Sequence, residues 1–329
     1  MIVAGIDVAH QTLALVIRLN AKNAKVQEFT NTATGHEGLL KTLRGAGVER
    51  VCLEATGLYH LDLALMLEAN GMALMVVNPK AVKRFAEALM TRTKSDAVDA
   101  AVLADFAQRM PFEAWVRPAT AALELRAYAR RLVALTEART QAKNQLHAMM
   151  QTTSTPRMIL DDVQLTITEC DAHLERLRTG VLALIEAEGL LKDTFALLTS
   201  VKGIAAASAI QTMGEVLVLP PDLRAKQWVA MAGLDPRHAS SGTSVNKKPR
   251  LSKAGNRHLR QALYMPALSA ARHDEHIHGY YRHLIENRGL KKIQAICAVM
   301  RKLLHAIHGM LNTRQPFDGR RFYALPEAG

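Results

Sequence analysis

Five short apolar segments in the first 80 residues restrict the fold more than any other feature of this chain. The first three are close enough in sequence to pair as antiparallel hairpins. The last two are separated by a helical pattern at Tyr59–Ala69, which is long enough for a crossover between parallel strands. This order predicts a mixed α/β domain with the first strand at its centre. The segments are Val3–Ile6, Leu13–Leu19, Val26–Phe29, Val51–Leu53 and Met72–Val77.

Four acidic residues stand where these segments end or where a helix begins. Asp7 and Glu54 each close an apolar strand segment, and Asp96 and Asp99 lie three residues apart on one face of a predicted helix. Carboxylate oxygens are the ligands that Mg²⁺ prefers, and two such ions can clamp the attacking and leaving oxygens of a phosphodiester displacement. Acids are also common in first helical turns for structural reasons alone. The strand–strand–helix order of all four favours the metal site.

A three-strand meander, a βαβ unit and a helix follow one another in the order of the ribonuclease H fold. In that order Asp7 lies on the first strand, Glu54 ends the fourth, and the helix that begins at Asp96 packs beside them. The four carboxylates are therefore expected to converge. We assign residues 1–120 to this domain.

Residues 121–193 show a different period, with apolar positions spaced by seven. Two apolar seams flank a break at residues 152–156, which includes Pro156, and this predicts an antiparallel coiled-coil hairpin. Such an arm is more often a spacer or an oligomerisation device than a catalytic element. The seam positions are Leu125, Leu132, Arg139, Leu146, Tyr128, Leu135, Ala142 and Met149 before the break, and Leu160, Ile167, Leu174, Val181, Val163, Cys170, Leu177, Leu184 and Leu191 after it.

The third predicted domain, residues 194–329, is mainly helical and carries the charge excess. Residues 196–329 hold 20 Lys and Arg against 8 Asp and Glu, which accounts for the whole formal net charge of +12. A basic region of this density is typical of a nucleic-acid-binding surface, whereas a surface that only confers solubility is the alternative. The segment Leu198–Ile204 and the residues after it indicate a helix-hairpin-helix turn, which presents backbone N–H groups to a phosphate. Ala205 stands where such turns usually have their second glycine.

A long loop is predicted at residues 232–245, followed by a basic segment and two helices at Arg257–Arg272 and Lys291–Leu311. Basic side chains in this region are expected to contact phosphates, which positions a nucleic acid without reading its sequence. The candidate contacts are Lys202, Lys247, Lys248, Arg250, Lys253, Arg257 and Arg260.

Other functions are disfavoured by what the sequence lacks. No apolar run approaches the ~20 residues of a membrane span, and the N-terminus has no signal-peptide pattern. Cys52, Cys170 and Cys297 match no metal-ligand spacing and are typical of buried residues in a reducing cytoplasm. No GxxxxGK[ST] phosphate loop is present, so direct use of ATP is not expected.

Taken together, the segments resemble the DEDD transposases of bacterial insertion sequences, the IS-one-ten group of bridge-RNA-guided recombinases. The resemblance covers nearly the whole chain, and the order and spacing of its short motifs make it specific. The motifs are GID at 5–7, EATG at 54–57, NP at 78–79, KSDAVDA at 94–100, AGLDPR at 232–237, SGTSV at 241–245, LSKAG at 251–255 and RQALYMPA at 260–267.

The resemblance implies a site and a set of partners. Asp7, Glu54, Asp96 and Asp99 would hold Mg²⁺ in a RuvC-like domain, and Ser241 would attack DNA, with Ser244 as the alternative nucleophile. An element-encoded bridge RNA would choose the target by base pairing. The implied location is the bacterial cytoplasm, in association with the nucleoid.

These assignments predict a composite catalytic site that forms a phosphoserine intermediate on double-stranded DNA. Because recombination joins two duplexes, we expect a homodimer or a dimer of dimers, with serine and acids acting in cis or in trans. A metal-dependent junction-resolving nuclease that uses water as nucleophile is the alternative, and a non-catalytic nucleic-acid-binding protein is a third class.

Overall fold

The computed structural model describes residues 1–20, 22–55, 57–90, 93, 95–241 and 245–325, with the side chains of residues 23 and 238–248 outside the description. The chain divides into two compact units, residues 1–117 and 118–329. Each unit has its own core.

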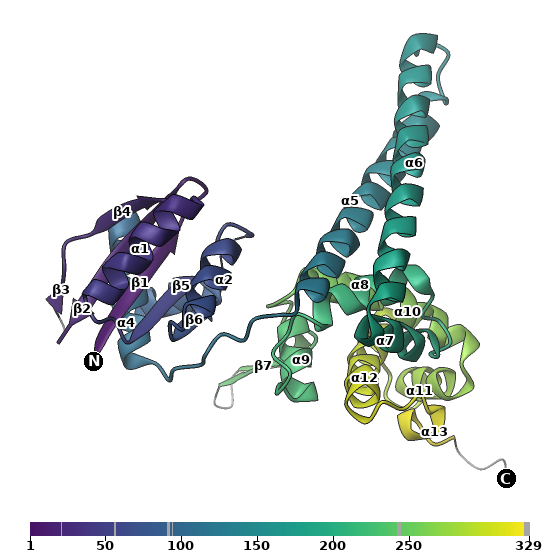
Figure 1. The fold of residues 1–329 in the computed structure, drawn as a ribbon. Helices are drawn as coiled ribbons and strands as arrows, with labels where there is room; N and C mark the ends of the chain where they lie inside the picture. The colour runs from purple at the N-terminus through teal and green to yellow at the C-terminus, as the bar shows by residue number, and fades with distance from the viewer. Residues whose placement is uncertain (21, 56, 91–92, 94, 242–244, 326–329) are drawn as a thin grey trace. The chain divides into compact units, whose positions relative to one another are not determined.

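The first unit is a mixed sheet with helices on both faces (Figure 1). Its strands are β1 (Ile2–Val8), β2 (Thr12–Leu19), β3 (Lys22–Asn23), β4 (Gln27–Thr30), β5 (Arg50–Glu54) and β6 (Leu74–Val77), and its helices are α1 (Ala33–Gly45), α2 (Leu61–Ala69), α3 (Pro79–Ala88) and α4 (Asp96–Arg109). The sheet order is β3-β2-β1-β5-β6, and β4 pairs with β2. β2 runs antiparallel to β1 and β4, whereas β1, β5 and β6 are parallel. The meander, the crossover and the central first strand agree with the predicted ribonuclease H order.

Alternation along the strands divides this core into two layers. Ala4 and Ile6 of β1 pack with the buried leucines of α1 and α2, whereas Val3 packs with α3 and α4 on the other face. Successive side chains of a strand point to opposite faces, so residues 3, 5 and 7 all face α4.

Gly5 allows α4 to lie directly on β1. A Cβ at this position would lie 2.1 Å from the carbonyl oxygen of Ala100 and 2.3 Å from the backbone nitrogen of Ala104. Arg18 of β2 fixes the same helix, because its guanidinium pairs with Asp105 at 3.0 Å and donates to Gln108 at 2.8 Å. The position of α4 relative to the sheet is therefore closely determined.

The second unit begins with two long helices, α5 (Thr120–Met149) and α6 (Arg157–Ala187), which pack along each other and extend away from the remaining helices (Figure 1). The turn between them lies at the predicted break. Among the predicted seam positions, Leu125, Leu132, Leu135 and Ala142 of α5 are buried. Ile167, Cys170, Leu174 and Val181 are buried on α6. The structure thus shows a helical hairpin, and its coiled-coil form stays a prediction.

Nine further elements follow the hairpin. They are α7 (Gly189–Thr199), α8 (Ala206–Val216), α9 (Ala225–Ala232), β7 (Pro236–Ser241), β8 (Val245–Leu251), α10 (Arg257–His273), α11 (Glu275–Glu286), α12 (Lys292–Thr313) and α13 (Gly319–Phe322). Leu125 and Leu132 from the base of the hairpin share one core with Leu198, Leu263 and Leu303. The predicted division at residue 193 therefore follows a change in sequence pattern and charge, while the core continues across it.

The prediction of a loop at residues 232–245 is wrong for residues 236–241, which form a strand. Residues 236–241 and 245–251 form an antiparallel β-hairpin, with an irregularity in the pairing between Arg237 and Ala239. These segments are rich in Ser, Lys and Arg and lack alternating apolar residues. They therefore give no strand signal, and backbone pairing between the two segments forms the hairpin instead.

A turn containing Gly203 joins α7 to α8 where the sequence indicated a helix-hairpin-helix turn, and its binding to phosphate stays a prediction. Gly203 has a φ of +107°, and a Cβ there would lie 2.6 Å from the backbone nitrogen of Ala270 in α10. Across the described parts of the chain, no helix combines the length and the apolar character that a membrane crossing requires.

Candidate active site and nucleic-acid interface

The register of the central strands places Asp7 beside Glu54. β1 and β5 are parallel and their last paired residues are Ile6 and Leu53, so Asp7 and Glu54 directly follow this pair on the two strands. Neighbouring strands lie about 4.8 Å apart, and residues side by side in a parallel pair point to the same face. That face carries Gly5 and is the one covered by α4.

α4 brings the other two acids to the same end of the sheet. Its contact with Gly5 is made by Ala100, one turn after Asp96 and next to Asp99. The Ser95 hydroxyl caps the helix by accepting from the backbone N–H of Val98 at 3.4 Å. The positive end of the helix dipole therefore faces the carboxylates and partly offsets their charge.

The electrostatics of Asp7 show that the four acids lie close to one another. Burial is the main cause that raises the pKa of Asp7 to about 6, and the negative charges of Asp99, Asp96 and Glu54 raise it further. The backbone N–H of Val8 acts in the opposite direction. A carboxylate that three others repel attracts a divalent cation, because the cation offsets repulsion that protonation would otherwise relieve.

The donor set matches the chemistry of Mg²⁺, since all four side chains offer carboxylate oxygens. No group of three or more His, Cys, Asp or Glu side chains lies in a metal-holding arrangement among the described residues. The acids are thus gathered on one face without being drawn into coordination geometry.

Asn31 is a supporting residue that the sequence reasoning missed. Its Nδ2 donates to the carbonyl oxygens of Ala9, at 2.9 Å, and Tyr59, at 3.1 Å. Its Oδ1 lies 2.7 Å from Nε2 of His36. Asn31 thereby joins the turn after β1 to the segment that follows β5, which are the two strands that carry Asp7 and Glu54. No sequence pattern marked Asn31, because two of its partners lie 22 and 28 residues away and α1, which follows it, was not predicted.

Ser241 is the last residue of β7, and its backbone pairs with Val245 of β8. Its side chain, like the whole of Ser244, lies outside the described residues. The structure therefore places the candidate nucleophile at the tip of a β-hairpin.

Five of the seven candidate nucleic-acid contacts have described side chains. Lys202, Arg250, Lys253 and Arg257 are exposed. Arg260 is half-buried, and its Nη1 donates to the carbonyl oxygens of Ala232, at 2.9 Å, and Gly255, at 3.3 Å. The side chains of Lys247 and Lys248 on β8 lie outside the description.

The described basic residues form two groups. Lys202 precedes Gly203, which contacts Ala270, whereas Arg257 begins the same helix, α10. Thirteen residues of helix separate the two ends by about 20 Å. Arg250, Lys253, Arg257 and Arg260 thus form a cluster at the start of α10, and Lys202 lies toward its other end.

Two family models match the chain. A transposase model of the DEDD IS110 type matches residues 4–155, and a model described as the transposase IS116/IS110/IS902 family matches residues 195–282. The chain therefore belongs to the IS110 family of transposases. The matched segments include all four acids and Ser241.

Among characterised relatives, the chain is similar to the pilin gene-inverting protein of Moraxella bovis, with 28% identity over 332 residues, 96% of this chain and 97% of that protein. The corresponding protein of Moraxella lacunata has the same identity and coverage. Thermus thermophilus RuvC in complex with a Holliday junction substrate matches 35% of this chain and 98% of its own, at 19% identity and a TM-score of 0.28. A second Thermus thermophilus RuvC structure gives 18% identity, 35% and 100% coverage and a TM-score of 0.29. Because both TM-scores are low, these two structures carry no argument about the fold. The first unit has the ribonuclease H order because of its strand order alone.

Proposed function

We propose that this protein is a DNA transposase that cuts and rejoins strands through a covalent phosphoserine intermediate, with Ser241 as nucleophile. The observation that carries the proposal is the gathering of Asp7, Glu54, Asp96 and Asp99 on the α4 face of the sheet. These side chains would hold Mg²⁺. Bound there, Mg²⁺ would act as a Lewis acid on the scissile phosphate and stabilise charge on the attacking and leaving oxygens.

In the first step the hydroxyl oxygen of Ser241 bonds to phosphorus and the bond from phosphorus to the leaving strand breaks. The serine proton passes to a base, and the leaving strand oxygen takes up a proton. In the second step a hydroxyl of a new strand attacks the phosphoserine and releases the serine. Each step replaces one phosphate ester with another, so no ATP is required. A serine hydroxyl is a weak nucleophile at neutral pH, so its attack needs a base and the Lewis acid that bound Mg²⁺ would supply.

The remaining chain supplies binding. The cluster formed by Arg250, Lys253, Arg257 and Arg260 at the start of α10 provides positive charge for the phosphates of double-stranded DNA. Family membership supports guidance by an element-encoded RNA and action as a dimer or a dimer of dimers. The α5–α6 arm, with the coiled-coil form predicted for it, is the element that we assign to assembly.

A denaturing gel tests the nucleophile. Purified protein is incubated with its flanking DNA, the element-encoded RNA and Mg²⁺, and we expect a protein–DNA adduct that survives denaturation. Ser241→Ala should abolish the adduct, whereas Ser240→Ala, one residue away on the same strand, should retain it. Chelation of Mg²⁺ should also prevent its formation.

The same gel distinguishes the alternative enzyme class. A junction-resolving nuclease with water as nucleophile requires the four acids but not the serine. Strand cutting that persists in Ser241→Ala without any adduct would therefore replace the phosphoserine mechanism with that one. Loss of the adduct in Ser244→Ala but not in Ser241→Ala would move the nucleophile to Ser244.

A further inference from the structure

Glu215 of α8 is a buried charged residue that the proposed function does not use. Only 2% of its side chain is exposed. Its carboxylate accepts two hydrogen bonds from Arg130 of α5, from Nε to Oε1 at 2.8 Å and from Nη2 to Oε2 at 3.0 Å. Nδ2 of Asn256 donates to Oε2 at 2.5 Å. One buried carboxylate therefore joins the base of the α5–α6 arm to Asn256, the N-cap residue of α10.

The sequence around Glu215 makes this contact possible. The preceding residue, Gly214, faces α5, and a Cβ there would lie 2.9 Å from the Cβ of Ala129 and 3.1 Å from the Cα of Arg126. The absent side chain allows α8 to approach α5 closely enough for the paired geometry with Arg130. Glu215 is the only charged residue in α8.

The carboxylate is held in its ionised form. Burial by itself would raise the pKa of Glu215, but the hydrogen bonds from Arg130 and Asn256 outweigh burial and lower it. Removal of Arg130 is costly, because it leaves the buried charge of Glu215 without compensation. We therefore expect Glu215 to hold Arg130 of α5 and Asn256 in a fixed relative position.

Asn256 connects the Glu215 carboxylate to Met231 of α9, the helix that precedes the β7–β8 hairpin. Its Oδ1 caps α10 by accepting from the backbone N–H groups of His258 and Leu259, at 2.9 and 3.2 Å, and its own backbone N–H donates to Met231 at 2.6 Å. Gly255, with a φ of +137°, permits this approach, since a Cβ there would lie 2.1 Å from the Met231 carbonyl oxygen.

The hairpin itself is closed at its base. The Ser252 hydroxyl donates to Oδ1 of Asp235 at 2.5 Å, and the backbone N–H of Ser252 donates to the Asp235 carbonyl oxygen at 3.0 Å. The strands between these residues end at Ser241 and begin again at Val245. We expect a shift of Asn256 to displace the base of the hairpin and, with it, the strand that ends at Ser241.

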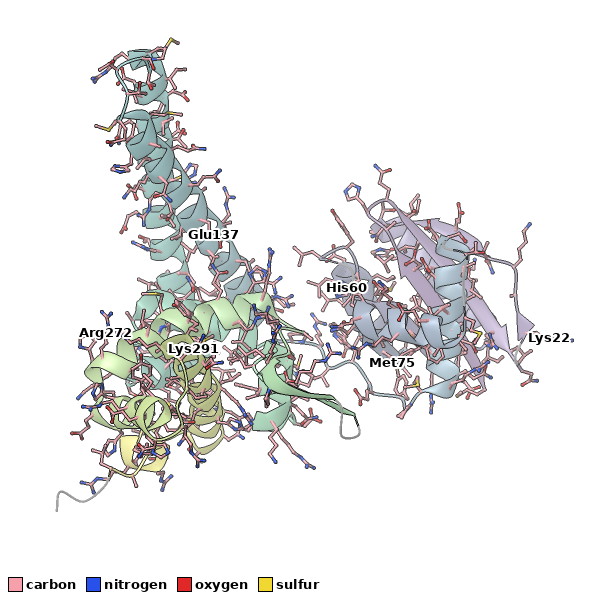
Figure 2. The ribbon with its side chains drawn as sticks, turned by 180° about the vertical axis from the view of Figure 1, so that it is seen from behind. Lys22, His60, Met75, Glu137, Arg272 and Lys291 are labelled. Atoms are coloured by element: carbon pink, nitrogen blue, oxygen red, sulfur yellow. The ribbon has the colours of Figure 1, made fainter. Side chains whose placement is uncertain are left out.

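We infer that Glu215 is a positioning residue that sets the β7–β8 hairpin, and with it Ser241, against the base of the α5–α6 arm. The inference rests on the proposed function only for the role of Ser241. A second contact supports it: Nε2 of Gln261 in α10 donates to Oε1 of Glu137 on α5 at 2.7 Å. Figure 2 labels Glu137 on the arm.

The test uses the full-length protein with Glu215→Gln and Arg130→Gln. We expect the rate of adduct formation to fall by about 10²-fold, the effect of misplacing a reacting group by about 1 Å. The affinity for DNA, measured separately, should stay within about threefold, because none of the exposed phosphate contacts is changed. Hydrogen exchange of the Asn256 backbone amide should accelerate by about tenfold or more.

Arg139→Gln is the matched control. Arg139 lies on the same helix and pairs with Asp171 at 2.6 Å, with a side chain 27% exposed against 37% for Arg130. It should leave both adduct rate and exchange unchanged. If Glu215→Gln does not fold, Arg130→Gln decides, since its side chain is partly exposed.

Wild-type adduct rate and wild-type exchange at Asn256 in either variant would overturn the inference, as would an equal effect of Arg139→Gln. The absence of an adduct even in the unmodified protein would contradict the proposed function. In that case accelerated exchange at Asn256 would still support the positioning role, and unchanged exchange would refute it.

Discussion

At the scale of single residues, Asp7 concentrates the chemistry of the first unit. It lies one residue before the end of the central strand β1 and faces α4, and burial together with the charges of three other acids raises its pKa. Burial and the neighbouring negative charges make the Asp7 carboxylate suitable for binding a cation. Without a cation, the same conditions make its ionised form unfavourable. Binding of Mg²⁺ would relieve this repulsion, because a cation offsets the charge of the carboxylates.

This repulsion predicts a pH-dependent cost in stability. Because the pKa in the folded protein is about 6 against an ordinary 3.8, the unfolded chain releases the proton first as pH rises from 4 to 6. The metal-free protein therefore loses stability across that window. Asp7→Asn should remove the loss and raise the free energy of unfolding at pH 7 by about 1 to 2 kcal/mol, allowing for solvent screening.

Urea denaturation at pH 4 and pH 7 in the presence of a chelator measures this effect. Asp161→Asn, which changes an exposed acid paired with Arg157 on α6, serves as control and should give no gain at pH 7. Equal stability of Asp7→Asn and the unmodified protein at pH 7 would contradict the expected repulsion.

At the scale of elements, the packing of α4 on β1 decides whether the acids meet. Only glycine at position 5 allows this approach, because the Cβ of any other residue would overlap the backbone of α4. Gly5→Ala should force the helix outward, reduce the free energy of unfolding by about 1 to 3 kcal/mol and abolish adduct formation.

Gly45→Ala is the matched control for this prediction. Gly45 is the last residue of α1, and a Cβ there would meet nothing within 4 Å. Since alanine favours the helix more than glycine does, this change should be neutral or stabilising by up to about 1 kcal/mol. Thermal unfolding and the denaturing gel together report both quantities, and normal activity in Gly5→Ala would show that α4 does not position Asp96 and Asp99.

At the scale of the whole molecule, the chain is built as two units with separate cores. The acids belong to residues 1–117, whereas Ser241 and the cluster at the start of α10 belong to residues 118–329. The connecting residues 111–119 form no helix or strand. The proposed reaction therefore needs both units. Because each unit has its own core, we expect residues 118–329 to bind DNA without residues 1–117.

Expression of the two units separately tests this division. Residues 118–329 should bind DNA in a mobility-shift assay, with affinity that falls steeply as salt rises, because the net positive charge lies in this part. The fragment should form no adduct, since it lacks the four acids. An adduct formed by residues 118–329 alone would show that the carboxylates do not take part in the attack.

What the sequence determined by itself was local. Alternating apolar residues and a helix start place Asp7, Glu54, Asp96 and Asp99 at the ends of their elements, and the heptad spacing marks the helical hairpin and its turn. These patterns depend on neighbours a few residues away, so they can be read without knowledge of the fold.

Only the tertiary structure decided the contacts between distant segments. The β7–β8 hairpin forms from polar residues that carry no strand pattern, and Arg260, predicted from its charge as a phosphate contact, also holds two backbone carbonyls. Glu215 finds Arg130 across 85 residues and Asn256 across 41. Such pairings depend on how closely helices approach, which is set by packing around residues such as Gly214, and no local periodicity encodes that distance.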